Sequence, residues 1–212
     1  MKKIPFTLAV IALCQIAPLL AAPALLLHWK MLAIMTAAAL LWLSQPAIRP
    51  GEVQANRSSD RSTLWLILIA AGVSTVTPEM EWAYYLDTYE GLPSWNAFGL
   101  ALMITGTSFR LWAIRSLGRY FTATVQTVTA QPLVSTGPYA VVRHPSYLGA
   151  YAAVLGCAVL LQAPVGFGVA AFTMFYAYYQ RIKVEEQILK GYFGETYDHY
   201  AARVKRLLPG IW

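Results

Sequence analysis

The chain has 212 residues, of which 58% are hydrophobic and 12% are charged. Soluble domains average about 45–50% hydrophobic and about 25% charged residues, so this chain has too few polar side chains to cover the surface of a soluble domain. The composition excludes an ordinary cytosolic enzyme, a disordered chain and a nucleic-acid-binding domain, and the formal net charge is a modest +6. We therefore expect one compact membrane bundle.

Six apolar segments are candidates for membrane-spanning helices, which need roughly 20 mostly apolar residues. They cover residues 4–27, 31–48, 63–76 with a further apolar stretch to 86, 95–114, 147–161 and 165–179. The last two are separated by Gln162-Ala163-Pro164, which is typical of the turn of a helical hairpin. The sequence predicts an all-α fold, a polytopic membrane helix bundle of about six transmembrane helices.

The distribution of charge predicts the orientation. With six spans, only Lys30 of the 16 Lys and Arg residues falls on one side, and all the others fall on the opposite side. The loop 79–90 carries acidic residues and no basic residue. Because basic residues gather in cytoplasmic loops, we expect both termini in the cytoplasm, as in a bacterial inner membrane.

A different interpretation of the first segment is a cleaved signal peptide. Lys2 and Lys3 precede the apolar run, and Ala22-Pro23-Ala24 resembles a cleavage site. Cleavage would leave five spans with the same orientation. The length of the run and the span that follows at once favour a retained helix.

Polar motifs begin where the fourth apolar segment ends. They are Leu117-Gly118 with Phe121, then Gly137-Pro138-Tyr139, then Arg143-His144-Pro145-Ser146-Tyr147-Leu148-Gly149, then Arg181 with Glu185-Glu186, then Phe193-Gly194 with Tyr197 and Tyr200. This order and spacing resembles the isoprenylcysteine carboxyl methyltransferase family, over residues 117–209. Phospholipid N-methyltransferases and some bacterial thiol methyltransferases share much of the pattern. We divide the chain into residues 1–116, with four transmembrane helices, and residues 117–212, a methyltransferase region of cytoplasmic connector, helical hairpin and C-terminal cytoplasmic helices.

The resemblance implies S-adenosyl-L-methionine as cofactor, with S-adenosyl-L-homocysteine as product. The sequence has no Gly-rich strand–turn–helix pattern, so a cytoplasmic pocket of the membrane bundle has to hold the cofactor. Eukaryotic members usually have a histidine where Gln131 stands here. The cofactor-binding positions that match the family are Gln126, Gln131, Leu133, Val134, Tyr139, His144, Pro145, Ser146, Tyr147 and Glu185.

Arg181 matches the arginine that faces the acceptor carboxylate in the family, and it is the predicted catalytic residue. Arg181 and Glu185 are four residues apart, so they share one face of a helix. A plain surface ion pair would stabilise the helix by only about 0.3–0.5 kcal/mol. Charged residues directly after an apolar span favour a functional role instead.

Several other residues have two interpretations. For His144 we favour a cofactor contact over a structural hydrogen bond, and Glu186 is expected to pair locally. For Arg143, membrane anchoring and a site role are equally favoured. Arg110 is expected to snorkel to the cytoplasmic face, with an acceptor contact as the alternative. Aromatic residues near span ends, among them Trp82 and Tyr178, are expected to form an interfacial belt.

The resemblance implies methylation of the carboxylate of an isoprenylcysteine-like lipophilic acceptor that comes from the bilayer. A carboxylate needs no general base, and Arg181 would bind it through two parallel hydrogen bonds. The alternatives are a phospholipid N-methyltransferase, a thiol S-methyltransferase, a lipid-binding membrane protein without activity and a small transporter. No metal site is implied, because Cys14 and Cys157 lie far apart inside apolar runs.

Overall fold

The computed structural model describes residues 3–46, 58–86, 90–122, 131–208, 210 and 212. In these ranges the regular elements are helices, and no strand is present. The main ones are α1 (Lys3–Ile11), α2 (Trp29–Ser44), α4 (Ser58–Tyr84), α5 (Pro93–Leu117), α6 (Pro145–Leu161), α7 (Pro164–Phe193) and α8 (Glu195–Arg203). The all-α prediction is therefore confirmed.

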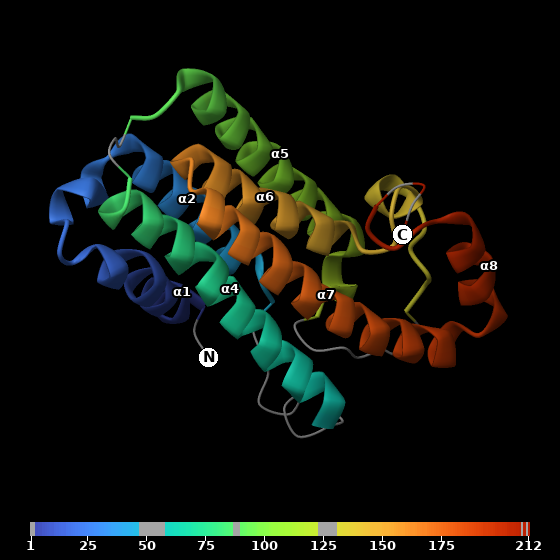
Figure 1. The fold of residues 1–212 in the computed structure, drawn as a ribbon. Coiled ribbons are helices and arrows are strands. Elements are labelled where there is room, and N and C mark those ends of the chain that lie inside the picture. Colours follow the sequence, from blue (N-terminus) through green and yellow to red (C-terminus); the bar gives the residue numbers. More distant parts are fainter. Residues whose placement is uncertain (1–2, 47–57, 87–89, 123–130, 209, 211) are drawn as a thin grey trace.

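Helices α5, α6, α7 and α4 lie side by side, and α8 lies at the far end of α7 (Figure 1). Helices α5 and α6 approach very closely because small residues face each other. A Cβ atom at Gly106 would lie 2.5 Å from the backbone nitrogen of Ala153, and one at Gly149 would lie 2.6 Å from that of Arg110. Small residues at helix contacts replace the hydrophobic driving force that is missing within a membrane.

The predicted hairpin turn is confirmed, because α6 ends at Leu161 and α7 begins at Pro164. Gln162 adopts a left-handed conformation with φ of 55°. Its side chain accepts a hydrogen bond from the backbone nitrogen of Leu92 at 3.0 Å and donates one to Asn96 Oδ1 at 2.9 Å. The turn is therefore fixed to the start of α5.

Helix α7 is one continuous element that extends well beyond the predicted end of its apolar segment at residue 179. The carboxylate of Glu81, on α4, accepts hydrogen bonds from the backbone nitrogens of Val165 and Gly166 at 3.2 and 2.6 Å. These donors have no partner within the helix, so Glu81 caps the start of α7. The same helix then carries Arg181 and Glu185 at its other end.

The prediction of one continuous helix over residues 4–27 is wrong. Helix α1 ends at Ile11 and continues as a π-helical turn over Ala12–Ile16, followed by two 3₁₀ turns over Ala17–Leu19 and Pro23–Leu27. Pro18 and Pro23 each lie in the first positions of a 3₁₀ turn. Because proline lacks the backbone donor that a helix interior needs, it starts helical turns and interrupts longer ones.

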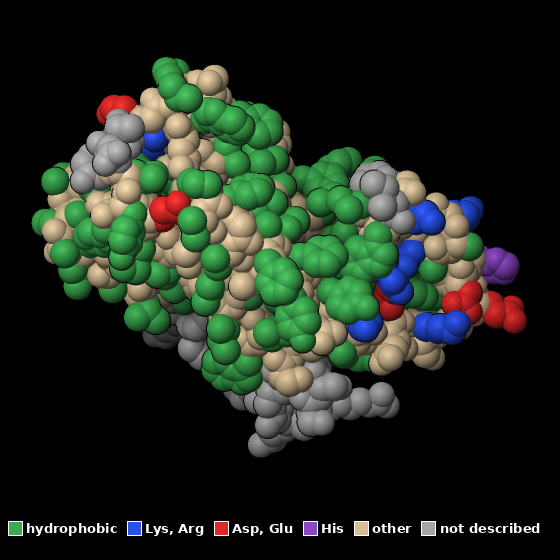
Figure 2. Space-filling model, in the orientation of Figure 1, with side chains coloured by type: hydrophobic (Ala, Val, Ile, Leu, Met, Phe, Trp, Pro, Cys, Tyr) green, Lys and Arg blue, Asp and Glu red, His purple; other side chains and the backbone are tan. Residues whose placement is uncertain are grey.

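Two helices in the described part of the chain are long and apolar enough to cross a membrane, Ser62–Tyr84 and Pro93–Tyr120. Three other apolar helices are shorter, Thr7–Leu19, Trp29–Ser44 and Pro145–Leu161. Figure 2 shows hydrophobic side chains over most of one face of the bundle, whereas most charged side chains gather at the end where α8 lies. Large apolar side chains such as Leu20, Leu27 and Phe172 are more than two-thirds exposed, as expected for a surface in contact with lipid.

Candidate functional site

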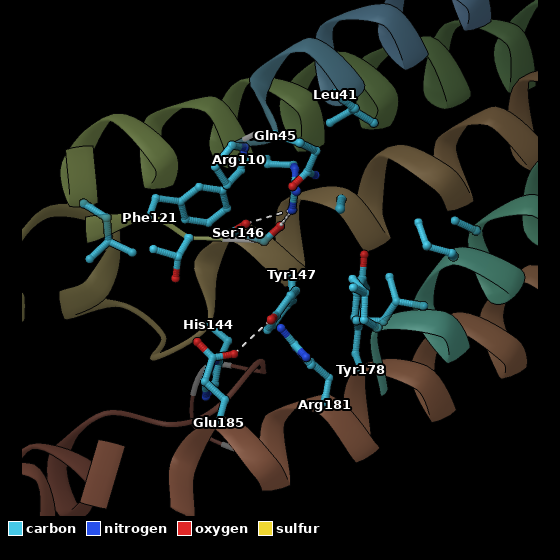
Figure 3. Close-up of a pocket in the computed structure, with 18 of the residues that line it drawn as sticks. Leu41, Gln45, Arg110, Phe121, His144, Ser146, Tyr147, Tyr178, Arg181 and Glu185 are labelled. Atoms are coloured by element: carbon cyan, nitrogen blue, oxygen red, sulfur yellow. Dashed lines mark hydrogen bonds and ion pairs between the residues drawn. The ribbon is translucent and has the colours of Figure 1, made fainter. Parts of the chain in front are cut away.

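A cavity of about 580 Å³ lies between the helices and is lined by residues of α1, α2, α4, α5, α6, α7 and α8. Its volume is within the range of about 300–1,000 Å³ that is typical of ligand pockets. Polar side chains line the part near α8 (Figure 3). The predicted site residues that line the cavity are Gln131, Leu133, Val134, Tyr139, His144, Ser146, Tyr147, Arg181 and Glu185.

Two predicted cofactor-binding residues are not placed in the cavity wall. Gln126 lies outside the described residues. Pro145 is buried and is the first residue of α6, and it is not part of the lining. A proline at this position favours the start of a helix, and Ser146 and Tyr147, which follow it, line the cavity.

Helix α7 brings Arg181 and Glu185 to the same side of the cavity, as their spacing predicts. The Arg181 side chain is buried, and its guanidinium donates a hydrogen bond to Thr63 Oγ1 on α4 at 3.0 Å. Glu185 accepts a hydrogen bond from the hydroxyl of Tyr147 at 2.9 Å. His144 Nδ1 lies 3.9 Å from the same carboxylate oxygen. The Arg181 guanidinium and the Glu185 carboxyl group therefore reach the same cavity.

Three aromatic rings form a stack in the cavity wall. The Tyr147 ring lies between His144, at a centroid distance of 5.8 Å, and Tyr178, at 4.8 Å. Tyr178 is 4% exposed, and Trp82 is fully buried, so the interfacial-belt interpretation is wrong for both residues. A planar aromatic wall suits a flat apolar or heteroaromatic ligand group.

Arg110 lines the cavity, whereas the sequence analysis favoured a position at the cytoplasmic face. Its side chain is 5% exposed and donates hydrogen bonds to the Ser146 carbonyl at 2.9 Å and to Ser146 Oγ at 2.7 Å. Figure 3 shows Arg110 and Arg181 reaching into the cavity from opposite walls. The snorkelling interpretation is therefore wrong. The position of an arginine within an apolar run could have indicated this, since ionisable groups at membrane depth are usually functional.

The segment after α8 pairs with the Arg143-His144 motif through backbone hydrogen bonds. The backbone nitrogen of Arg143 donates to the Lys205 carbonyl at 2.7 Å, and that of His144 donates to the Arg206 carbonyl at 3.0 Å. The Arg143 side chain also donates to the carbonyls of Ala201 and Val204. Arg143 thus connects two segments of the protein, which contradicts its interpretation as a membrane anchor.

Glu186 lies at the centre of these contacts and pairs with residues distant in sequence, which corrects the expected local pairing. Its carboxylate accepts hydrogen bonds from Arg143 at 2.7 and 2.9 Å and from Arg206 at 2.8 Å, and it lies 3.3 Å from His144 Nε2. Burial alone would raise the pKa of Glu186. The hydrogen bonds from His144, Arg143 and Arg206 outweigh burial and hold the pKa of Glu186 at about 2.

Helix α8 contributes two tyrosines to the lining that the sequence motifs did not assign to the site, Tyr197 and Tyr200. The hydroxyl of Tyr200 donates to the carbonyl of Tyr139 at 2.7 Å. Burial raises the pKa of Tyr200 to about 12, so this hydroxyl is a neutral donor at physiological pH. The amphipathic spacing of a short helix predicts one buried face, but not the cavity that the face contacts.

The described residues form a helical bundle with a largely apolar surface and a cavity that carries charged side chains near α8. Residues 99–191 match the model of the isoprenylcysteine carboxyl methyltransferase (ICMT) family. This range begins before the motifs and includes Arg110. The predicted family resemblance is therefore confirmed.

Curated relatives are similar over about half of this chain. Protein-S-isoprenylcysteine O-methyltransferase B of Arabidopsis thaliana is 36% identical over 116 residues, which is 54% of this chain and 59% of the relative. The protein-S-isoprenylcysteine O-methyltransferase of Rattus norvegicus is 36% identical over 118 residues, which is 55% of this chain and 42% of the relative. The chain spans about half the length of these relatives.

A solved structure extends the similarity to almost the whole chain. It is described as the eukaryotic intramembrane Ras methyltransferase ICMT, and it matches with a TM-score of 0.67 and 26% sequence identity. The match covers 97% of this chain and 74% of that structure. The N-terminal helices therefore belong to the shared fold, although they carry none of the motifs.

Proposed function

We propose that this chain is an integral membrane methyltransferase that uses S-adenosyl-L-methionine and methylates the carboxylate of an isoprenylcysteine-like lipophilic acceptor. The observation that carries the proposal is the pair of buried arginines, Arg110 and Arg181, on opposite walls of a largely apolar cavity. The similarity to protein-S-isoprenylcysteine O-methyltransferases supports the same reaction.

The residues in the cavity fit the proposed cofactor. Glu185 offers a carboxylate for a cationic amine, and Tyr147 donates to it and limits its orientation. The stacked rings of His144, Tyr147 and Tyr178 offer a flat wall for an adenine. S-adenosyl-L-methionine, when bound, supplies a methyl group that is already activated by the positive charge of its sulfur.

The chain contributes binding, orientation and exclusion of water. Arg181 and Arg110 hold the acceptor carboxylate between them, and Arg110 Nε has no protein partner among the described residues. A carboxylate is ionised at neutral pH, so no general base is required. Catalysis then comes from positioning and from fixed positive charge in an enclosed site.

The two positive charges also favour an anionic acceptor. A protonated amine headgroup would be repelled by Arg110 and Arg181, which disfavours N-methylation of phosphatidylethanolamine. A thiolate is anionic and stays as the second candidate acceptor. The lipid-binding alternative without activity does not explain why a glutamate and two arginines converge in one cavity.

We also propose six transmembrane segments with both termini and the cofactor pocket on the cytoplasmic side of a bacterial inner membrane. The positive-inside distribution of Lys and Arg supports this orientation. The concentration of charged side chains near α8 agrees with a cytoplasmic position for that end (Figure 2). Residues 117–212 would form the methyltransferase region, and residues 1–116 would complete the bundle.

The first test is isothermal titration of the detergent-purified protein with S-adenosyl-L-homocysteine. We expect micromolar binding by the wild type and a loss of about 10- to 100-fold in Glu185→Ala, because a hydrogen bond to a charged group contributes about 1.5–3 kcal/mol. Glu195→Ala, an exposed glutamate on α8, is the matched control. Equal affinity of the wild type and Glu185→Ala would contradict the assignment of Glu185.

The second step is transfer of a labelled methyl group to three acceptors, N-acetyl-S-farnesyl-cysteine, phosphatidylethanolamine and a small thiol. We expect the farnesylated carboxylate to be the preferred acceptor. Methyl transfer to phosphatidylethanolamine alone would contradict the proposed carboxylate acceptor, but it would still support S-adenosyl-L-methionine as the cofactor.

A further inference from the structure

The cavity has a second end, far from Arg181, that none of the family motifs explains. Residues of the N-terminal helices line it, among them Cys14, Gln15, Gly72 and Thr75. The first helix changes there from α1 to the π-helical turn Ala12–Ile16. The wider π-helical turn is rare and is frequently found at functional sites. It places Leu13, Cys14 and Gln15 together in the cavity lining.

Gln15 is a polar residue without a partner at this end. Its side chain is 3% exposed, and no hydrogen bond to it is present among the residues that the structure describes. Gln15 Oε1 is fully enclosed without a donor. A buried amide without partners is costly in an apolar environment, and such groups in folded proteins usually contact water or a ligand.

Glu79 repeats this feature on the neighbouring helix. It lies four residues after Thr75 on α4, one turn further along the same face. It is 1% exposed, and neither carboxylate oxygen has a partner among the described residues. Gln15 and Glu79 are therefore both buried without hydrogen-bond partners among the described residues, but only Gln15 is part of the cavity lining.

The distance along α4 between the level of Arg181 and the level of the π-helical turn can be estimated from the helix rise. Arg181 contacts Thr63 on α4, and Gly72 and Thr75 follow on the same helix after nine and twelve residues. At 1.5 Å per residue this is about 14–18 Å. A Cβ atom at Gly72 would lie 3.9 Å from Cys14 Sγ, so the π-helical turn is at this level. The lining of α4 between the two levels is apolar, with Leu64, Ile67, Leu68 and Ala71.

We infer that the deep end of the cavity, at Gln15, is a subsite for a hydroxyl group at the far end of an isoprenoid acceptor chain. The inference rests on the proposed function only for the place of the acceptor carboxylate at Arg181. The apolar wall of α4 receives the chain, and Gln15 hydrogen-bonds the terminal hydroxyl. A hydroxyl both donates and accepts, so it satisfies the Gln15 amide in either orientation.

The test compares two probes, N-acetyl-S-farnesyl-cysteine and its analogue with a hydroxyl group on the terminal methyl. Their dissociation constants are measured by calorimetry on the full-length protein in detergent, in the presence of S-adenosyl-L-homocysteine. We expect the wild type to bind the hydroxylated analogue about 3- to 10-fold more tightly, the equivalent of one net hydrogen bond. Equal or tighter binding of the plain probe, or binding of neither probe, would overturn the inference.

Two variants locate the effect. In Gln15→Leu the preference for the hydroxylated probe is expected to disappear or reverse, whereas Gln187→Leu, an exposed position on α7 outside the cavity, is expected to keep it. Gln15→Met, which keeps the length of the side chain, replaces Gln15→Leu if that variant does not fold. A preference that persists in a folded Gln15 variant would show that the hydroxyl binds elsewhere and would overturn the subsite.

Methyl transfer to both probes is measured in parallel, which separates the two proposals. A binding preference without methylation of either probe supports the subsite and contradicts the proposed function. Methylation of both probes without a binding preference supports the function and contradicts the subsite.

Discussion

Two glutamates with little exposure, Glu186 near α8 and Glu79 on α4, have very different surroundings. Glu186 is paired with Arg143 and Arg206 and lies beside His144, so its charge is balanced by cationic partners. Glu79 is 1% exposed and has no hydrogen-bond partner among the described residues. Glu186 therefore helps to hold the segments near α8 together, whereas Glu79 is expected to destabilise the part of the bundle around it.

A buried carboxyl group has different effects on a protein when it is paired and when it is unpaired. A buried ion pair with complete hydrogen bonding fixes the position of the segments that carry it, although its net contribution to stability is small. A buried carboxyl without partners only costs free energy in the empty protein. The experiments below test the contrast, in order of the expected effect.

The largest effect is expected for Arg181→Ala. Removing a fixed positive charge from the reacting centre should lower methyl transfer by about 100- to 1,000-fold, which is the usual loss for an oriented charge-stabilising donor. Affinity for S-adenosyl-L-homocysteine should stay near the wild-type value. Arg115→Ala, an exposed position on α5, is the control. A parallel loss of binding and turnover would show that Arg181 serves the cofactor.

Glu186→Leu should lower the free energy of unfolding by about 3 kcal/mol, because it leaves Arg143 and Arg206 without their shared carboxylate. The Glu186 side chain is only 11% exposed, so water cannot replace it fully. The measurement is thermal or denaturant unfolding in detergent. A variant as stable as the wild type would mean that the backbone hydrogen bonds between residues 142–144 and 204–206 suffice without it.

The stability contributed by Glu186 should also depend on pH. Its pKa is held at about 2 in the folded protein, below its ordinary value of 4.5. The contribution is therefore complete above about pH 4.5 and is lost as the pH falls toward 2, with a total of at most about 3 kcal/mol. The difference in stability between the wild type and Glu186→Gln should shrink from pH 5 to pH 3 by roughly half of that amount. A constant difference over this range would contradict the low pKa of Glu186.

Glu79→Leu is the matched substitution on α4, and it should act in the opposite direction. Removing a buried carboxyl without partners should raise the free energy of unfolding by about 1–2 kcal/mol. The same unfolding assay decides the sign. A clear loss of stability would reveal that Glu79 has a partner in the working protein, and the contrast between the two glutamates would then fail.

The sequence predicted those features that depend on residues close together along the chain. The hairpin turn at 162–164 follows from a proline between two apolar runs. Arg181 and Glu185 share a helix face because they are four residues apart. These relations depend on short stretches of chain, and the structure places them as expected.

The sequence could not predict relations between distant segments. An apolar run does not tell whether Tyr178 faces lipid or the cavity, because both environments favour apolar residues. Arg110 and Ser146 meet only because α5 and α6 approach closely over their full length. The pairing of Glu186 with Arg206 depends on the path of the chain after α8, for which a single sequence holds no signal.

The close approach of α5 and α6 has a consequence for motion. Backbone atoms in contact at Gly106 and Gly149 leave no room for sliding or tilting, so the two helices move as one rigid body. Helices α4 and α7 are similarly joined, with Gly166 against Pro78 and a hydrogen bond of 2.9 Å between Ser74 and Thr173. The first helix, in contrast, is interrupted by short π and 3₁₀ turns, and we expect it to yield more easily than the paired helices. A long hydrophobic chain would pass through the flank of the bundle at that helix, while the pair of helices that carries Arg110 and Tyr147 stays still.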